Sequence, residues 1–326
     1  MSQSSSSVLD QLDRHQVAIY LGAIAAGAVA AWAAPGSDSA LAAVINPALG
    51  ALLYVTFLQV PATDLGRALR DHRFVAALLL LNFVVVPVVV GALFGFLPSE
   101  QAVRVGVLLV LLCPCVDYVI VFAGLAGGSR RRLIAATPLL LLLQMVLLPL
   151  YLWLFMGPDL TDVVEFRPFV EAFVFLIVIP LALAWLTQWS AGRTPIIRRV
   201  ESAATATMVP LMAVVLFAVV GSQLPKLDGN YRDVVAVVPV YVIFLVVMAG
   251  AGALVAALFS LDTASRRSVV FSGATRNSLV VMPLALALPA GFEVAAVVVV
   301  TQTLVEVVGM VIFVRLIPKL IPARIS

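Results

Sequence analysis

The chain has 326 residues, of which 63% are hydrophobic and only 11% are charged. Soluble globular domains carry about 25% charged residues, so this composition excludes that class and indicates a polytopic membrane protein. The formal net charge of +3 does not indicate a nucleic-acid partner, because the basic residues lie in short stretches between apolar runs.

Ten apolar segments have the length that a membrane-spanning helix requires, about 17 to 25 residues. In chain order they are residues 16–34, 41–60, 74–97, 102–126, 133–157, 169–189, 203–221, 234–259, 269–289 and 291–316. The connections between them are short, so we predict no extramembrane domain.

The basic residues divide unequally between the two sides of this arrangement. Of the 20 Lys and Arg residues, 15 lie on the side of both termini, 4 lie on the other side, and Arg276 lies within the ninth segment. Cytoplasmic loops carry the excess of Lys and Arg. Both termini are therefore expected in the cytoplasm, and the protein in the inner (plasma) membrane.

The ten segments divide into two halves of five, residues 16–157 and 169–317. Five is odd, so a duplicated second half enters the membrane with opposite polarity. We predict an all-α fold built as a 5+5 inverted repeat. Residues 1–15 and 318–326 are then cytoplasmic tails, and residues 158–168 form an extracellular connection.

The fourth segment carries Cys113, Pro114, Cys115 and Asp117 inside an apolar run. A charged residue within the membrane costs about 2.5 to 3.5 kcal/mol, and such residues normally face a bundle interior or a cavity on a transport route. Pro114 has no N–H group and its ring clashes with the preceding turn, which predicts a helix break. A disulfide between residues two apart in one segment is geometrically poor.

The ninth segment is interrupted at the corresponding place of the second half. A polar stretch runs from Ser272 through Thr275 to Ser278, and Pro283 follows it. Paired interruptions in two inverted halves are the best sequence indication of a transporter's central site. We therefore predict breaks at Pro114 and Pro283.

Three charged residues share one depth in the membrane. At 1.5 Å per residue, Asp117, Arg276 and Glu306 lie about 15, 12 and 14 Å from the cytoplasmic ends of their segments. An arginine stays protonated in a protein, so Arg276 needs a carboxylate, an anion or water. Asp117 and Glu306 are the candidate partners, either as structural ion pairs or as groups that exchange a proton during transport.

These residues resemble the bile acid/arsenite/riboflavin transporter superfamily, and within it the arsenite-efflux permease branch. The stretch from Cys115 to Phe122 is similar to the one that holds the branch's functional cysteine, which falls on Cys115. Arg276-Asn277-Ser278 is similar to its Arg-Asn-(Asn/Ser) sequence, and 304–307 to its Leu-(Ile/Val)-Glu-Val signature. The resemblance implies ten helices in two sub-bundles, a panel and a core. It also implies that segments four and nine cross as broken helices at the bilayer centre.

Three positions depart from the family. The permease branch commonly has an acid where Val280 stands and is usually apolar where this chain has Asp117. The sodium-coupled bile acid symporters have an acid where this chain has Ser272. The first two departures weaken the case for arsenite, and the third argues against sodium coupling of the symporter kind.

The leading hypothesis is a proton-coupled secondary transporter that exports arsenite or a related metalloid. Trivalent arsenic is thiophilic, so we predict Cys115 as a transient metalloid ligand. The substrate site would also contain Asp117, Arg276, Asn277 and Ser278, with Asp117 and Glu306 relaying charge. Further candidates are Cys113, Tyr118 and Thr275.

The alternative is a sodium- or proton-coupled symporter of a small organic anion, in which Arg276 and helix N-termini hold the carboxylate. An intramembrane enzyme is disfavoured, because His15 and His72 lie outside the spans and no catalytic constellation is present. No cofactor is expected. The expected partners are a small inorganic or anionic solute, H+ or Na+, and membrane lipids.

The remaining polar residues of the spans have simpler interpretations. Asn82, Gln144 and Gln302 are expected to form interhelical hydrogen bonds. The run from Arg130 to Arg132 is a topology signal that also suits anionic lipid headgroups.

Overall fold

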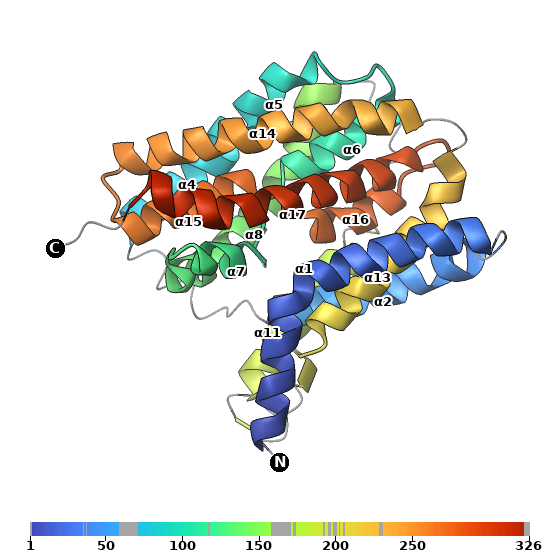
Figure 1. The fold of residues 1–326 in the computed structure, drawn as a ribbon, viewed down its shortest axis with the longest axis horizontal. Coiled ribbons are helices and arrows are strands. Elements are labelled where there is room, and N and C mark those ends of the chain that lie inside the picture. The colour runs from blue at the N-terminus through green and yellow to red at the C-terminus, as the bar shows by residue number, and fades with distance from the viewer. Residues whose placement is uncertain are drawn as a thin grey trace. The chain divides into compact units, whose positions relative to one another are not determined.

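The computed structural model describes residues 2–34, 36, 38–58, 71–116, 118–157, 171, 174–191, 193–194, 197, 201, 203–204, 206–227 and 231–322. Within these residues every regular element is a helix (Figure 1), which confirms the all-α class. The predicted connection 158–168 lies outside the described residues, as do residues 323–326 of the predicted C-terminal tail.

Five helical stretches of the described chain are long and apolar enough to cross a membrane. They are Ser39–Leu58, His72–Phe94, Arg130–Met156, Val234–Leu258 and Val294–Leu320. Shorter apolar helices cover Ala18–Ala33, Gln101–Leu111 and Met208–Ser222. At 1.5 Å per residue, the 11 residues of Gln101–Leu111 span only about half of the hydrocarbon core, which is about 30 Å thick.

The chain forms two compact units, and neither coincides with a predicted half. One unit contains Met1–Gln59 and Arg167–Gly229, and the other contains Val60–Phe166 and Asn230–Ser326. Helices of the first half therefore pack against helices of the second half in each unit. Two compact units are also what the resemblance implies.

The first unit contains α1 (Ser2–Ala33), α2 (Asp38–Leu58), the π-helix η3 (Val174–Val178), α11 (Ile179–Ala191), α13 (Met208–Gln223) and the 3-10 helix η4 (Leu224–Leu227). Helix α1 includes nearly all of the predicted tail 1–15. Helix α13 packs against α1 and α2. The contact with α1 is close, because a Cβ atom on Gly27 would lie 2.6 Å from the carbonyl oxygen of Phe217. Small residues allow this approach between apolar helices.

The described residues of the second unit form ten helical elements. They are α4 (His72–Leu80), the π-helix η2 (Leu81–Val85), α5 (Val86–Phe94), α6 (Gln101–Leu111), α7 (Tyr118–Leu125), α8 (Arg130–Met156), α14 (Tyr231–Leu258), α15 (Thr263–Ala274), α16 (Ser278–Leu286) and α17 (Val294–Leu320). Figure 1 shows α14 and α17 running alongside each other. Helix α17 also packs against α6 and α16, and α14 packs against α15.

Two of the predicted segments consist of two helices each. Helix α6 ends at Leu111 and α7 begins at Tyr118, with Pro114 between them. Helix α15 ends at Ala274 and α16 begins at Ser278. The predicted break at Pro283 is wrong in its position, because Pro283 lies inside α16. A proline one turn into a helix loses only one backbone hydrogen bond, and α16 continues through it.

Candidate substrate and ion site

The two non-helical stretches of the second unit pair with each other. An isolated antiparallel bridge joins Pro114 to Arg276. The bridge gives hydrogen-bond partners to backbone groups of the two stretches that lie between helices. Its hydrogen bonds run from the N–H of Cys115 to the carbonyl of Thr275, at 3.4 Å, and from the N–H of Asn277 to the carbonyl of Cys113, at 2.9 Å.

Both cysteines lie in this pairing, and neither is part of a disulfide. Cys113 and Cys115 are buried, as is Thr275. The structure thus brings these three candidates together with Arg276 and Asn277. Asp117 lies outside the described residues, and so does the side chain of Tyr118, so their predicted roles stay predictions.

The side chain of Arg276 is fully buried, with 0% of its surface exposed. Its guanidinium donates hydrogen bonds to four oxygen atoms. Nη2 lies 2.8 Å from Oδ1 of Asn82, 2.7 Å from the carbonyl of Ser272 and 2.8 Å from that of Gly273, and Nη1 lies 3.2 Å from the carbonyl of Leu111. The three carbonyls belong to the last turns of α6 and α15. The cation therefore sits at the negative ends of two helix dipoles.

Asn82 supplies the side-chain oxygen of this arrangement from a third element. It lies in the π-helix η2, a backbone form that is frequent at functional sites. Its Nδ2 donates to Oγ of Ser272 at 3.1 Å. The predicted interhelical hydrogen bond of Asn82 is confirmed, whereas its contact with Arg276 was not predicted. An amide in the middle of an apolar run was the only available signal.

Glu306 contacts Arg276 from α17. Its side chain is 0% exposed, and its Oε2 accepts the backbone N–H of Arg276 at 2.7 Å. The same oxygen accepts Nε2 of Gln302 at 2.5 Å. Glu306 thus holds the backbone at the bridge, which connects α17 to the break between α15 and α16.

The N-terminus of α16 carries the remaining candidates. Asn277 caps the helix, because its Oδ1 accepts the N–H of Val280 at 3.2 Å. Asn277 is 1% exposed, and its Nδ2 has no hydrogen-bond partner within the described residues. Oγ of Ser278 lies 2.7 Å from Oγ1 of Thr303 and 3.3 Å from Oε1 of Gln302.

The predictions for the side-chain amides of Gln302 and Gln144 have different outcomes. The predicted interhelical hydrogen bond of Gln302 is confirmed by its contact with Ser278. The prediction for Gln144 is wrong: this residue of α8 is 2% exposed, and neither amide atom has a hydrogen-bond partner within the described residues. Its position in α8 places the amide inside the unit, where no polar group from the described part of another helix comes within reach.

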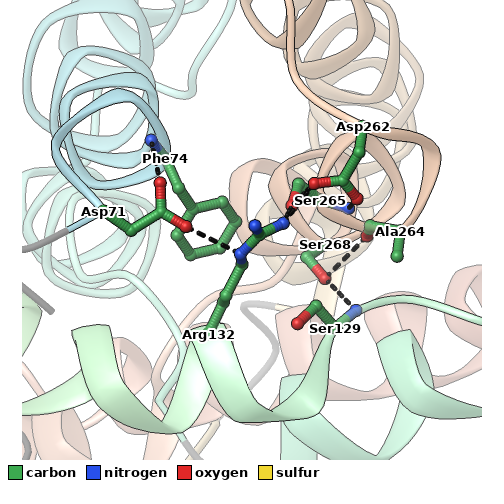
Figure 2. A network of polar contacts seen from close by, with 8 residues as sticks. All are labelled: Asp71, Phe74, Ser129, Arg132, Asp262, Ala264, Ser265 and Ser268. Carbon is green, nitrogen blue, oxygen red and sulfur yellow. Dashed lines mark hydrogen bonds and ion pairs between the residues drawn. The ribbon is translucent and has the colours of Figure 1, made fainter. Parts of the chain in front are cut away.

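A second polar network joins the ends of three helices (Figure 2). Arg132 lies in the first turn of α8, and its Nε is 2.7 Å from Oδ2 of Asp71. Its Nη1 contacts the carboxylate of Asp262 and the hydroxyl of Ser265. Asp71 caps α4, and Asp262 caps α15. Arg132, predicted as a topology signal, therefore also connects α4, α8 and α15.

This network predicts a loss of stability in acid. Partial burial raises the pKa of Asp262, but the hydrogen bonds from Arg132 and from Ser265 outweigh it, and the net pKa lies below its ordinary value. A depressed carboxyl pKa stabilises the fold above the unfolded value, near 3.9, and this contribution is lost as the pH falls through the folded pKa. We expect Asp262→Asn to lower the Tm at pH 7. The loss of stability should be about 1 kcal/mol or less, because the ion pair between Arg132 and Asp262 is half exposed.

The difference in stability between Asp262→Asn and the wild type should shrink below about pH 4, where the wild-type carboxyl also becomes neutral. Thermal unfolding in detergent at pH 7, 5 and 3 measures it. Arg132→Gln, which removes the other partner, should reproduce the same pH dependence. A difference that stays constant down to pH 3 would contradict the assignment.

Comparison with known proteins identifies a family over part of the chain. A family model described as the sodium bile acid symporter family matches residues 46–227, a range that extends from α2 to η4 and includes the Cys113–Cys115 side of the bridge. No curated protein matches the chain.

Proposed function

Because the chain belongs to the sodium bile acid symporter family, a family of membrane transporters, we propose that it carries a small organic anion across the plasma membrane together with a coupling cation. The protein is a multi-pass membrane protein by its family and its apolar helices. The family favours this function, which the sequence indicated as the alternative, over arsenite export.

We further propose ten membrane crossings as a 5+5 inverted repeat, with both termini in the cytoplasm. In this arrangement α6 with α7 is one broken crossing, and α15 with α16 is another. Their meeting at the bilayer centre is supported by the bridge between Pro114 and Arg276 and by the shortness of α6.

The observation that carries the proposal is the bridge with helix ends on both sides of it. Helix N-termini are the positive ends of their dipoles, and in transporters with discontinuous helices they point at anionic groups. Helix α16 begins at the bridge with Asn277, whose Nδ2 is a buried donor without a partner in the described chain. A carboxylate satisfies such a donor. Direct binding of the solute by Arg276 stays a prediction.

The test is uptake by the full chain in liposomes, with a labelled bile acid as the first probe and small carboxylates next. We expect accumulation under an inward cation gradient and none in protein-free liposomes. Asn277→Asp keeps an oxygen for the helix cap but replaces the Nδ2 donor with a negative charge. This variant should keep the wild-type Tm and lose at least tenfold in uptake. Absence of uptake of every probe by the wild type, or wild-type uptake by the variant, would reject the proposal.

Arsenite export remains a second candidate because of one observation, the buried thiol of Cys115 at the bridge. A single thiol binds a thiophilic metalloid reversibly, which transport requires. If this function holds, everted vesicles accumulate arsenite under a proton gradient, and Cys115→Ser reduces the accumulation to background. Cys113→Ser is the matched control and should retain it. Arsenite transport that persists in Cys115→Ser would exclude the thiol.

A further inference from the structure

The oxygens around Arg276 form the kind of site that a coupling cation occupies. In transporters with discontinuous helices, unwound carbonyls and the C-terminal ends of half-helices coordinate the coupling ion. Carbonyl and amide oxygens are also the ligands of hard cations. Here the oxygens of Leu111, Asn82, Ser272 and Gly273 converge from α6, η2 and α15, and a guanidinium lies among them.

More oxygens surround one nitrogen of the guanidinium than it has hydrogens to donate. Three oxygens lie within 2.7 to 2.8 Å of Nη2, which has two hydrogens to donate. The acceptors therefore outnumber the donors at this atom. Two of these oxygens are at the negative end of α15, so they favour a positive charge.

The charge of Arg276 is permanent. An arginine does not lose its proton in a protein, and this side chain is fully buried. A metal ion in the same cluster would overlap the volume of the guanidinium and would be repelled by its positive charge. The two cations are therefore mutually exclusive there.

We propose that Arg276 is a tethered cation, whose guanidinium takes the place of a bound Na+ among the oxygens of Leu111, Asn82, Ser272 and Gly273. The protein then needs no Na+ at this position. The inference rests on the proposed function and deepens it, because it selects the proton from the two coupling ions considered for the symporter.

The test measures Na+ binding without any transported solute. The purified full chain is unfolded thermally in detergent in NaCl or in choline chloride at equal ionic strength. The wild type should have the same Tm in both salts. Arg276→Ala removes the guanidinium and leaves the oxygens, so its lowered Tm should rise with Na+ saturably, by several degrees. Arg276→Lys keeps a tethered charge and should show no difference between the salts.

The matched control is Arg267→Ala in α15, the helix that precedes Arg276. The guanidinium of Arg267 also donates to helix-end carbonyls, those of Ile321 at 2.8 and 3.0 Å and of Ala126 at 2.9 Å, but it is only partly buried. Water replaces it, and we expect no Na+ response.

Three results would overturn the inference. They are a saturable Na+-specific rise in the Tm of the wild type, the same rise in Arg276→Lys, and the absence of any Na+ response in Arg276→Ala. If Arg276→Ala does not fold, the wild type and Arg276→Lys still decide, and anion uptake by the wild type in choline chloride supports the inference. Failure of the proposed function appears separately, as an absence of uptake in liposomes.

Discussion

Glu306→Ala is expected to lower the free energy of unfolding by about 3 kcal/mol or more, because it leaves two buried donors without an acceptor, at about 1 to 3 kcal/mol each. Glu306 and Arg276 are both fully buried, and the carboxylate accepts the backbone N–H of Arg276 at 2.7 Å. Alanine leaves this N–H and Nε2 of Gln302 without their acceptor and leaves the charge of Arg276 less compensated. Thermal unfolding of the purified protein in detergent measures the effect.

The control is Glu293→Ala at the N-terminus of the same helix. The carboxylate of Glu293 also accepts a backbone N–H, that of Gly291 at 2.9 Å, but in an exposed position. Loss of an ordinary hydrogen bond in an exposed position costs about 0.5 to 1.5 kcal/mol. Equal Tm values for the two variants would show that Glu306 does not hold the bridge.

Gly106→Leu is expected to destabilise the second unit by about 3 kcal/mol or more, at the upper end of the cost of overpacking. A Cβ atom on Gly106 of α6 would lie 2.9 Å from the carbonyl oxygen of Ala295 and 3.0 Å from its Cα in α17. Backbone atoms do not move aside as a side chain does, so α6 must separate from α17, the helix that carries Glu306. The fraction of monodisperse protein after purification and its Tm measure the effect.

Gly250→Leu is the matched substitution in α14. A Cβ atom at Gly250 meets no atom within 4 Å, so the added side chain has open space. The free energy of unfolding of this variant should stay within about 0.5 kcal/mol of the wild-type value, as is usual for surface substitutions. If Gly106→Leu were as stable as Gly250→Leu, the close approach of α6 and α17 would be wrong.

The membrane class and the position of the central residues followed from local information. Apolar runs between short loops are visible along the chain, because the requirement for about 20 apolar residues per crossing acts on each segment separately. Pro114 and the polar stretch at Arg276 are conspicuous for the same reason, since each interrupts its own apolar run. The family matched over residues 46–227 agrees with a membrane transporter.

The partners of these residues were decided only by the tertiary structure. Arg276 bonds to Asn82 across 194 positions of the chain and to Leu111 across 165, and no local pattern relates such distant residues. The sequence offered Asp117 and Glu306 as carboxylate partners for Arg276, and the role of Asp117 stays a prediction. The structure adds the carbonyls of two helix ends and the amide oxygen of Asn82 as acceptors of the guanidinium, which the sequence did not indicate. Helix C-termini become cation ligands only when packing brings two of them together. For the same reason the sequence divided the chain into consecutive halves, while packing assembled two units from both.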